Sequence, residues 1–386
     1  MSGHRILLIT TGGTIAQTHD EAGVTTQNKD SQPFAEMVDS IKDNLNEKAA
    51  RGLDPEIHEI ECVSIRQVLN KDSSNVVSDD WKNIINTIVE EYDNYEGFVI
   101  THGTNTLGYT SAALSFALEA VGKPVILTGS QVSFGYPGSD APMNLENSIR
   151  VAAYKKNKHK RLCGVMVVFG SMIITGVRVK KTNEFNYDSF EAFNSPHTIA
   201  RIGNTIRFNN IALDAHFEKF ENGRLSRQRD LKPHVKLEFK TECIASLTEF
   251  PGTSPDIFEA LVKHANVKGF ILRSFGAGDP NVLDLEKIKD GTYHANLNKA
   301  FQYLMDKEIP IIITTQAPTG KASMDINDPG RYAVEKFNAI PAHDMSIESM
   351  TVKLAWLLGQ GCSYDEIRKQ MSISLRGEIA IPEKSI

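Results

Sequence analysis

Residues 6–15 read ILLITTGGTI, and this stretch decides the fold of the chain. Its first four residues are all isoleucine or leucine, which is typical of a strand buried on both faces. The Gly-Gly pair that follows allows a sharp turn and lets other groups approach the backbone closely. Thr14 comes just after this turn. In an open parallel sheet, ligands bind beyond the carboxyl ends of the strands. Thr14 is therefore either a residue of the chemistry or a loop threonine that only hydrogen-bonds its own turn.

The length and charge of the chain narrow the class of protein. A chain of 386 residues exceeds the size at which single cores stop growing, so we expect two domains. The net charge of −6 argues against a nucleic-acid surface and favours an enzyme for small molecules. No apolar run approaches the roughly 18 residues of a membrane helix. The N-terminal residues lack a signal-peptide pattern, and we expect a cytoplasmic protein without membrane partners.

The cysteines and histidines give no sign of a metal centre. The four cysteines, Cys62, Cys163, Cys243 and Cys362, have neither CxxC nor metal-ligand spacing. The eleven histidines are scattered along the chain. We therefore expect free thiols in a reducing cytosol, and neither a structural nor a catalytic metal.

Strands and helices alternate through the first half of the chain. Besides the opening strand, we expect strands at residues 57–63, 97–101, 124–128, 164–169 and 172–175, and helices at 33–41, from 78 onward, at 111–120 and at 144–154. This order predicts a parallel sheet with helices on both faces. Residues 17–32 are polar and read as a long loop of the kind that often forms a lid.

The alternation breaks near residue 200 and resumes near residue 244. Residues 218–230 are polar and read as a connector. Beyond them we expect strands at 244–247, 269–272 and 311–314, helices at 257–265 and 297–305, and two closing helices. The prediction is an α/β protein with mainly parallel sheets: a larger domain at 1–205, a linker at 206–240 and a smaller domain at 241–386.

Two of the predicted strands end in the same Gly-Thr dipeptide, at Gly13-Thr14 and Gly103-Thr104. If these strands are parallel neighbours, the two threonine hydroxyls meet at one edge of the sheet. A threonine hydroxyl is a weak nucleophile until a base takes its proton. Lys181 could be that base if burial lowers its pKa. Backbone N–H groups of a glycine turn are suitable donors to an oxyanion.

These motifs resemble the bacterial-type L-asparaginase family, which also includes glutaminases and an amidotransferase subunit. The family signature TGGTI is complete at residues 11–15, and HGTDT appears as HGTNT at residues 102–106. The segments LRSFGAG at 272–278 and LRGE at 375–378 resemble the cytoplasmic type I branch. The resemblance implies an asparaginase-like fold of a larger and a smaller α/β domain and no cofactor. It also implies a homodimer or homotetramer whose sites are completed by a neighbouring subunit.

The resemblance also implies roles for particular residues. Thr14 matches the nucleophile that attacks the side-chain amide, and Thr104 and Lys181 match the threonine and lysine that move protons. Ser73 and Ser74 match the positions that hold the α-carboxylate of the substrate. The same two serines would equally satisfy an ordinary Asx/Ser turn.

The chain departs from the family pattern at two residues that would bind substrate. Asn105 replaces the aspartate that receives the α-ammonium group in relatives, and a neutral amide cannot supply that negative charge. Asp279 replaces an asparagine that relatives contribute from a partner subunit. The carboxylate lost at 105 would be regained at 279; alternatively, Asp279 only faces solvent.

Three further positions affect catalysis or control. Relatives place a tyrosine in the flexible loop against the nucleophile, but no tyrosine precedes Tyr92 here. Ala317 replaces the cysteine that type I members often carry at an allosteric site, so we do not expect control by that route. His102 could be proposed as a base, but we expect it to be bonded to its loop backbone.

These features predict an amidohydrolase that converts L-asparagine or a close analogue to L-aspartate and ammonia through an acyl-enzyme on Thr14. Asn105 leaves two alternatives open. One is an asparaginase-like homologue or variant that is catalytically impaired and binds a ligand. The other is a hydrolase of an amide without a free α-amino group.

Overall fold

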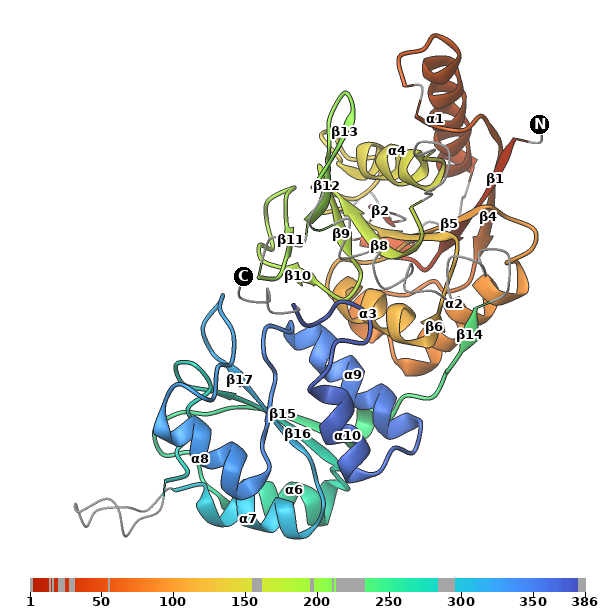
Figure 1. Cartoon of the computed structure of the whole chain (residues 1–386). Coiled ribbons are helices and arrows are strands. Elements are labelled where there is room, and N and C mark those ends of the chain that lie inside the picture. The colour runs from red at the N-terminus through yellow and green to blue at the C-terminus, as the bar shows by residue number, and fades with distance from the viewer. Residues whose placement is uncertain are drawn as a thin grey trace. The chain divides into compact units, whose positions relative to one another are not determined.

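The computed structural model describes residues 3–13, 15, 17–19, 25–27, 32–54, 56–154, 162–194, 198–209, 212, 233–283 and 296–380. The chain divides into two compact units, unit 1 at Met1–Leu237 and unit 2 at Glu238–Ile386. Both units are α/β, as predicted (Figure 1). None of the helices in the described ranges is both long and apolar enough to cross a membrane.

Unit 1 is built on one eight-stranded sheet with the order β13-β12-β9-β8-β7-β5-β1-β4. The bounds of these strands are β1 His4–Thr10, β4 Ile60–Gln67, β5 Gly97–Thr101, β7 Pro124–Thr128, β8 Gly164–Phe169, β9 Met172–Thr175, β12 Thr198–Ile202 and β13 Ile206–Phe208. Five neighbouring strands of this sheet, β8, β7, β5, β1 and β4, are parallel. Of these, β5, β7 and β8 are buried along their whole length. Such burial explains why these strands are continuous apolar runs in the sequence.

The strand at β9 differs from the purely parallel pattern. Only two residues separate β8 from β9, and the two strands pair in antiparallel fashion. A parallel return needs a crossover of about a dozen residues, so a connection this short forces a hairpin. The strands β12 and β13 extend this antiparallel margin.

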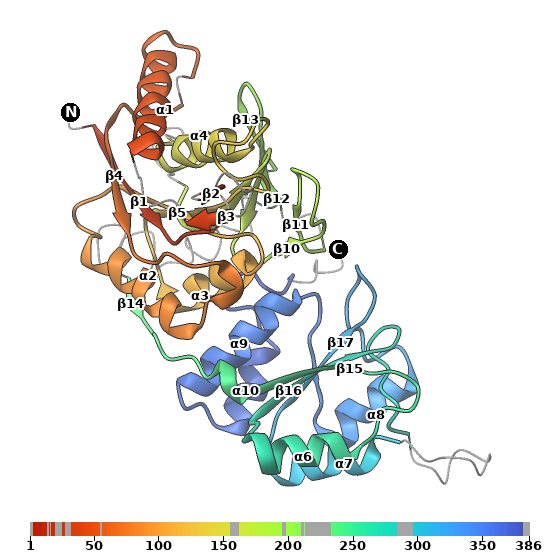
Figure 2. The same cartoon turned by 180° about the vertical axis from the view of Figure 1, so that it is seen from behind.

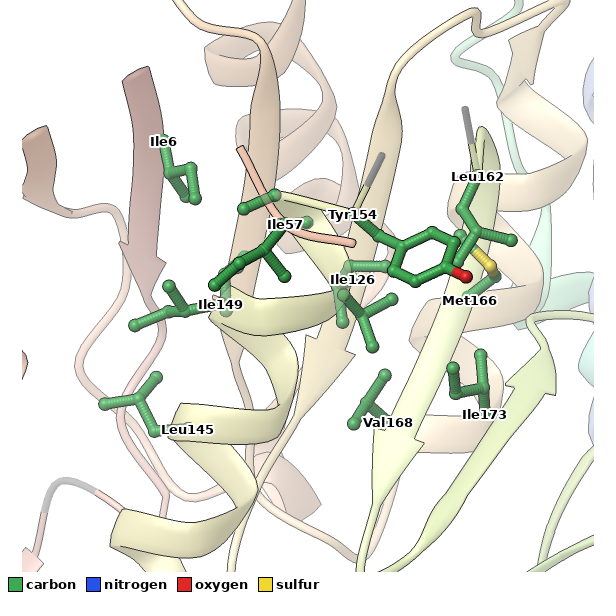
Figure 3. Packing of buried hydrophobic residues seen from close by; sticks show 14 of the residues in the cluster. Ile6, Ile57, Ile126, Leu145, Ile149, Tyr154, Leu162, Met166, Val168 and Ile173 are labelled. Carbon is green, nitrogen blue, oxygen red and sulfur yellow. The ribbon is translucent and has the colours of Figure 1, made fainter. Parts of the chain in front are cut away.

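Helices cover both faces of the unit 1 sheet, as predicted. Their bounds are α1 Gln32–Ala50, α2 Ser78–Glu90, α3 Leu107–Ala117 and α4 Ala141–Ala152. In both views α1 and α4 lie on one face, and α2 and α3 lie on the other (Figures 1 and 2). On the α4 face, Ile126 of β7 and Val168 of β8 pack in one buried cluster with Leu145 (Figure 3).

Shorter elements complete unit 1. They are β2 Gln17–His19, β3 Thr25–Gln27, the 3-10 turn η2 Ser73–Asn75, β6 Leu118–Glu119, β10 Val179–Lys181, β11 Phe190–Ala192 and β14 His234–Val235. The segment expected to be a loop at 17–32 contains the antiparallel pair β2 and β3. The connector expected at 218–230 lies outside the described residues.

Unit 2 contains a parallel sheet with the order β15-β16-β17-β18. The elements are η3 Thr241–Cys243, β15 Ile244–Thr248, α6 Asp256–Ala265, β16 Gly269–Ser274, α7 Asn298–Asp306, β17 Ile311–Thr315, α8 Asp328–Phe337, β18 Ile340–Pro341, α9 Ile347–Gly359 and α10 Tyr364–Met371. Phe258, Phe301 and Phe337, from α6, α7 and α8, share one buried core. After β17 the described chain has three helices where the sequence analysis expected two.

Candidate active site

The turn after β1 brings three loops of unit 1 together. Gly12 and Gly13 have φ angles of +91° and +79°, which favour glycine. A Cβ on Gly12 would lie 2.6 Å from the backbone nitrogen of Lys71, and one on Gly13 would lie 2.5 Å from that of Gly103. The loops after β1, β4 and β5 therefore touch through their backbones. Thr14, the predicted nucleophile, lies outside the described residues.

The strands β1 and β5 are direct neighbours in the sheet, as predicted. The strands pair in parallel, with Thr10 opposite Thr101 at their carboxyl ends. The Thr11 hydroxyl donates to the carbonyl of Thr101 over 2.8 Å and joins the two strand ends. The two Gly-Thr turns thus meet at one edge of the sheet.

Thr104 and Lys181 form a direct contact at this edge. The Nζ of Lys181 donates to Thr104 Oγ1 over 2.9 Å. Thr104 is 7% exposed, and Lys181 is half-buried at the end of β10. Although 77 residues apart in sequence, the two side chains form the pair that a threonine-to-lysine proton transfer requires.

The electrostatics of Lys181 suit a base. Burial lowers the pKa of Lys181, and the Glu184 carboxylate opposes that shift without reversing it. Among the residues that the structure describes, no carboxylate lies within ion-pair distance of its Nζ. A lysine with a lowered pKa is more often a neutral amine near neutral pH, and only the neutral amine can take a proton.

Ser73 and Ser74 lie against the same turn. Ser73 is buried, and a Cβ on Gly103 would lie 2.6 Å from its Oγ. The Thr106 hydroxyl donates to the Ser73 carbonyl over 2.7 Å. Asp72 caps the turn by accepting from the backbone N–H of Ser74. The Asx/Ser turn expected from the sequence is therefore present, and it carries both serines to the site.

Asn105 reaches Ser74 across the gap between the two loops. Its Nδ2 donates to Ser74 Oγ over 2.9 Å, and both residues are exposed. This hydrogen bond joins two neutral groups. It places a neutral amide where the family pattern has a carboxylate.

His102 is fully buried beneath the turn. Its Nδ1 bonds the carbonyl of Gly103 over 2.8 Å, and its Nε2 lies 3.0 Å from Thr110 Oγ1. Because a carbonyl oxygen can only accept, we assign the ring proton to Nδ1, which donates to Gly103. Nε2 then accepts from the Thr110 hydroxyl, whose oxygen in turn accepts from Trp81 Nε1. Burial lowers the pKa of His102 to about 4. This is the loop histidine bonded to backbone that the sequence analysis expected.

Asp140 is a structural residue of the site that the sequence reasoning missed. Its buried carboxylate accepts from the backbone N–H groups of Gln131 and Val132, both over 3.0 Å, and from the Asn144 amide. The Gln131 side chain in turn donates to the carbonyl of Glu184, three residues after Lys181. Asp140 thereby fixes the loop after β7 and, through it, the segment after the lysine. An aspartate directly before a helix is a signal that could have identified it.

Asp279 lies in unit 2, in the loop after β16. Its Oδ2 accepts from Asn327 Nδ2 over 2.7 Å, whereas its Oδ1 is buried without a hydrogen-bond partner among the described residues. Asp279 is thus half-buried, with one oxygen in an exposed hydrogen bond and the other buried. A buried carboxylate oxygen without a donor is costly unless a cationic or donor group satisfies it.

No group of three histidine, cysteine, aspartate or glutamate side chains that could hold a metal occurs in the described ranges. The four cysteines are free thiols. Within unit 1, the structure brings together Ser73, Ser74, Thr104, Asn105 and Lys181. This arrangement can position a hydroxyl, a base and hydrogen-bonding groups around a small amide.

Comparison with protein families assigns the class. Residues 5–213 match the family described as Asparaginase, N-terminal, and residues 244–371 match the Glutaminase/Asparaginase C-terminal domain. The chain therefore belongs to the asparaginase family, and it is an asparaginase-type amidohydrolase.

Particular relatives extend over most of the chain. It is 31% identical over 375 residues to the L-asparaginase of Thermococcus kodakarensis, covering 97% of this chain and 99% of that one. The structure of that enzyme matches with a TM-score of 0.77 over 97% of this chain and 99% of that chain, at 30% identity. L-asparaginase 1 of Escherichia coli K12 is 35% identical over 313 residues, 80% of this chain and 82% of that one.

A relative of different activity is also similar. A subunit of the glutamyl-tRNA(Gln) amidotransferase of Pyrococcus abyssi is 28% identical over 384 residues, 97% of this chain and 76% of that one. The family thus contains proteins that act on other substrates, and the substrate of this chain has to be argued from its own residues.

Proposed function

We propose that this chain hydrolyses the side-chain amide of L-asparagine or a close analogue, giving L-aspartate and ammonia. The observation that carries the proposal is the 2.9 Å hydrogen bond between Lys181 and Thr104, formed by a lysine with a lowered pKa at the edge where the two Gly-Thr turns meet. The named L-asparaginases among the relatives support it.

The proposed reaction runs through an ester on Thr14. The Thr14 hydroxyl attacks the amide carbon while its proton passes to Thr104 Oγ1 and the Thr104 proton passes to Lys181 Nζ. Lys181 then returns a proton by the same route to the leaving nitrogen, the C–N bond breaks, and ammonia departs. Water attacks the ester with the same relay and releases the carboxylic acid. Backbone N–H groups of the glycine turns would stabilise the oxyanion.

Ser73 and Ser74 would hold the α-carboxylate of the substrate. Ser74 lies exposed next to Asn105, and the Ser73 carbonyl is held by the Thr106 hydroxyl. Hydroxyl and N–H donors on one turn are suited to a carboxylate.

Asn105 favours a second class of substrate, namely amides without a free α-amino group. A charge-assisted hydrogen bond is roughly twice as strong as a neutral one, so recognition of an ammonium group weakens where a carboxylate becomes an amide. If the loss is complete, the chain binds a ligand but turns over slowly.

A panel of ammonia-release assays separates these functions. Asparagine, glutamine and an asparagine acylated on its α-nitrogen should be assayed for ammonia, and a cyclic amide for the carboxylic acid formed on ring opening, which releases no ammonia. Each should be tested with the full chain and with Thr14→Ala, which should be inactive. We expect the largest kcat/KM for asparagine. Release only from amides without an α-ammonium group would favour the second substrate class. A folded protein that hydrolyses none of them would contradict both hydrolase proposals.

We further propose that Asp279, contributed by a neighbouring subunit as the family resemblance implies, supplies the negative charge that Asn105 lacks. The unbonded Oδ1 of Asp279 supports this idea, because a substrate ammonium would satisfy it. Restoring Asn105→Asp should lower KM for asparagine about fivefold, as expected for one charged contact worth about 1 kcal/mol. The further change Asp279→Asn should then have little effect, although Asp279→Asn alone should raise KM. Additive effects in this double-mutant cycle would reject the compensation.

We also propose that the chain forms a homodimer or homotetramer. Phe185 and Tyr187 are 84% and 49% exposed on the loop that follows Lys181, and Tyr136, on a neighbouring loop, is 44% exposed. Exposed aromatic patches mark interaction surfaces. Sedimentation velocity should give a dimer or tetramer, and Phe185→Ser should shift it toward monomer. A fully active wild-type monomer would contradict the proposal.

The domain limits at 1–205, 206–240 and 241–386 and a cytoplasmic location also remain proposals. The family matches, which end at 213 and begin at 244, support a linker near these limits. The four free thiols are compatible with a reducing compartment.

A further inference from the structure

A cavity of about 820 Å³ lies in unit 2, remote from the carboxyl ends of its strands. It forms where β15, β16 and β17 begin, and the ends of α6 and α7 and the start of α10 also line it. The volume is within the range of about 300–1,000 Å³ that is usual for small-molecule sites.

Four lysines line the cavity, against two glutamates. Lys263 is paired with Glu259 over 2.5 Å on the surface of α6. Lys307 follows the last turn of α7, where a positive charge complements the helix dipole. The charges of Lys263 and Lys307 are therefore partly balanced within their own helices.

Lys240 and Lys268 have no such local explanation. They come from the segments before β15 and β16, and no carboxylate of the described residues lies within ion-pair distance of either one. Both side chains are exposed, so they offer two solvated ammonium groups to an anion in the cavity. The whole lining carries four lysines against two glutamates, and this excess of positive charge favours an anionic ligand.

The remainder of the cavity wall is apolar and aromatic. Tyr303 and Tyr364 are half-buried on opposite helices, and Ile309, Pro310 and Ile367 are buried at its surface. Burial raises the pKa of the Tyr364 phenol above its usual value. A ligand for this cavity needs an anionic end and a planar or apolar body.

We propose that this cavity binds an organic phosphate that carries a planar ring, which is the chemistry of a nucleotide. Lys240, Lys268 and Lys307 would contact the phosphate groups, because lysine ammonium groups bind phosphate as point charges. The ring would lie on the apolar wall beside Tyr303 and Tyr364. The site is independent of the amide chemistry in unit 1 and stands whether or not asparagine is the substrate.

Isothermal titration calorimetry with ATP, AMP, adenosine and pyrophosphate tests the proposal on the full chain. We expect ATP to bind more tightly than adenosine, which lacks the phosphates, and more tightly than pyrophosphate, which lacks the ring. Binding should weaken with rising salt, as expected of exposed charges. Lys268→Gln should raise the Kd for ATP about fivefold, the effect of losing one exposed charge contact.

Lys299→Gln is the matched control, because Lys299 is an exposed lysine of α7 that does not line the cavity. It should leave the Kd unchanged, and Tyr303→Leu should weaken ATP more than pyrophosphate. Three outcomes would overturn the proposal. They are no binding of ATP at millimolar concentration, equal weakening by Lys299→Gln and Lys268→Gln, and pyrophosphate binding as tightly as ATP. Circular dichroism of each variant excludes unfolding as the cause.

Discussion

Two buried or partly buried lysines, one in each unit, have opposite electrostatic surroundings. Lys353 on α9 is fully buried, donates to Glu378 over 2.7 Å and also bonds the carbonyl of Ile373. Lys181 is half-buried and bonds only the Thr104 hydroxyl among the described residues. The first lysine has its charge balanced by a carboxylate, and the second does not. The comparison indicates that a lysine is available as a base where its counter-charge has been left out.

The surroundings of Glu378 complete the contrast. Burial alone would raise the pKa of this carboxyl group. The Lys353 ammonium and the backbone N–H groups of Leu375 and Arg376 together lower it by more, so the net shift of the pKa is downward. The carboxylate thus holds residues 375 and 376, close to the C-terminus, against α9. This ion pair joins two segments of unit 2, whereas the hydrogen bond between Lys181 and Thr104 is the one to which we assign proton transfer.

Removing the unpaired lysine should have the largest effect, and the effect should be on rate. Lys181→Met deletes the proposed base and should lower kcat/KM by about 10²–10⁴-fold, the range for a general base. Its melting temperature should change little, since no ion pair with a described residue is broken. Lys180→Met is the control, because alternate residues of β10 point to opposite faces. A comparable loss of kcat/KM in Lys181→Met and Lys180→Met would contradict a specific role for Lys181 as the base.

Removing the paired lysine should instead affect stability. Lys353→Met leaves Glu378 buried without its partner, which should cost about 3–5 kcal/mol of unfolding free energy. The double variant Lys353→Met with Glu378→Gln should recover part of this loss, because the neutral amide is less costly to bury. Urea unfolding measures both values. If Lys353→Met were as stable as the wild type, the ion pair between Lys353 and Glu378 would contribute nothing to the free energy of unfolding.

A third buried basic group tests whether a lowered pKa alone identifies a base. Both ring nitrogens of His102 are hydrogen-bonded, so neither is available as a base. His102→Gln should therefore lower kcat/KM far less than the roughly hundredfold expected for loss of a general base. Its pKa of about 4, against the usual 6.5, means that the unfolded chain binds more protons between these values. Wild-type stability should therefore rise by about 3 kcal/mol in total as the pH increases from 4 to 6.5.

The His102→Gln variant should lack this part of the pH dependence. Urea titrations at pH 5 and pH 7.5 measure it, and the wild-type curve should shift more than that of the variant. An equal shift in both proteins would contradict a buried, neutral His102.

Much of this site could be predicted from the sequence, because its residues follow strands that are plain apolar runs. β5, β7 and β8 have the predicted bounds, and the register of β1 and β5 brings the two glycine turns together. Asp140 was missed because its role depends on Gln131, which reaches a loop 53 residues away. The strand β9 has the predicted bounds, but its antiparallel direction was not predicted; the two-residue connection from β8 is the signal for that direction.

The two lysines show the same limit. The sequence motif predicted a role for Lys181, whereas nothing near Lys353 on the chain indicates that Glu378, on the following segment, balances it. Whether a lysine is paired depends on long-range packing, and no local pattern records that packing. The structure therefore adds the charge balance, on which the proposed role of Lys181 depends.

The pH dependence of kcat/KM for ammonia release tests the central claim most directly. The neutral amine of Lys181 is the active form, so kcat/KM should rise with pH through an ionisation lying below the usual lysine pKa of 10.5. Lys181→Met should lose this ionisation together with the activity, and Lys180→Met should keep both. A profile that shows no such basic ionisation, or that is unchanged in Lys181→Met, would contradict the assignment of Lys181 as the base.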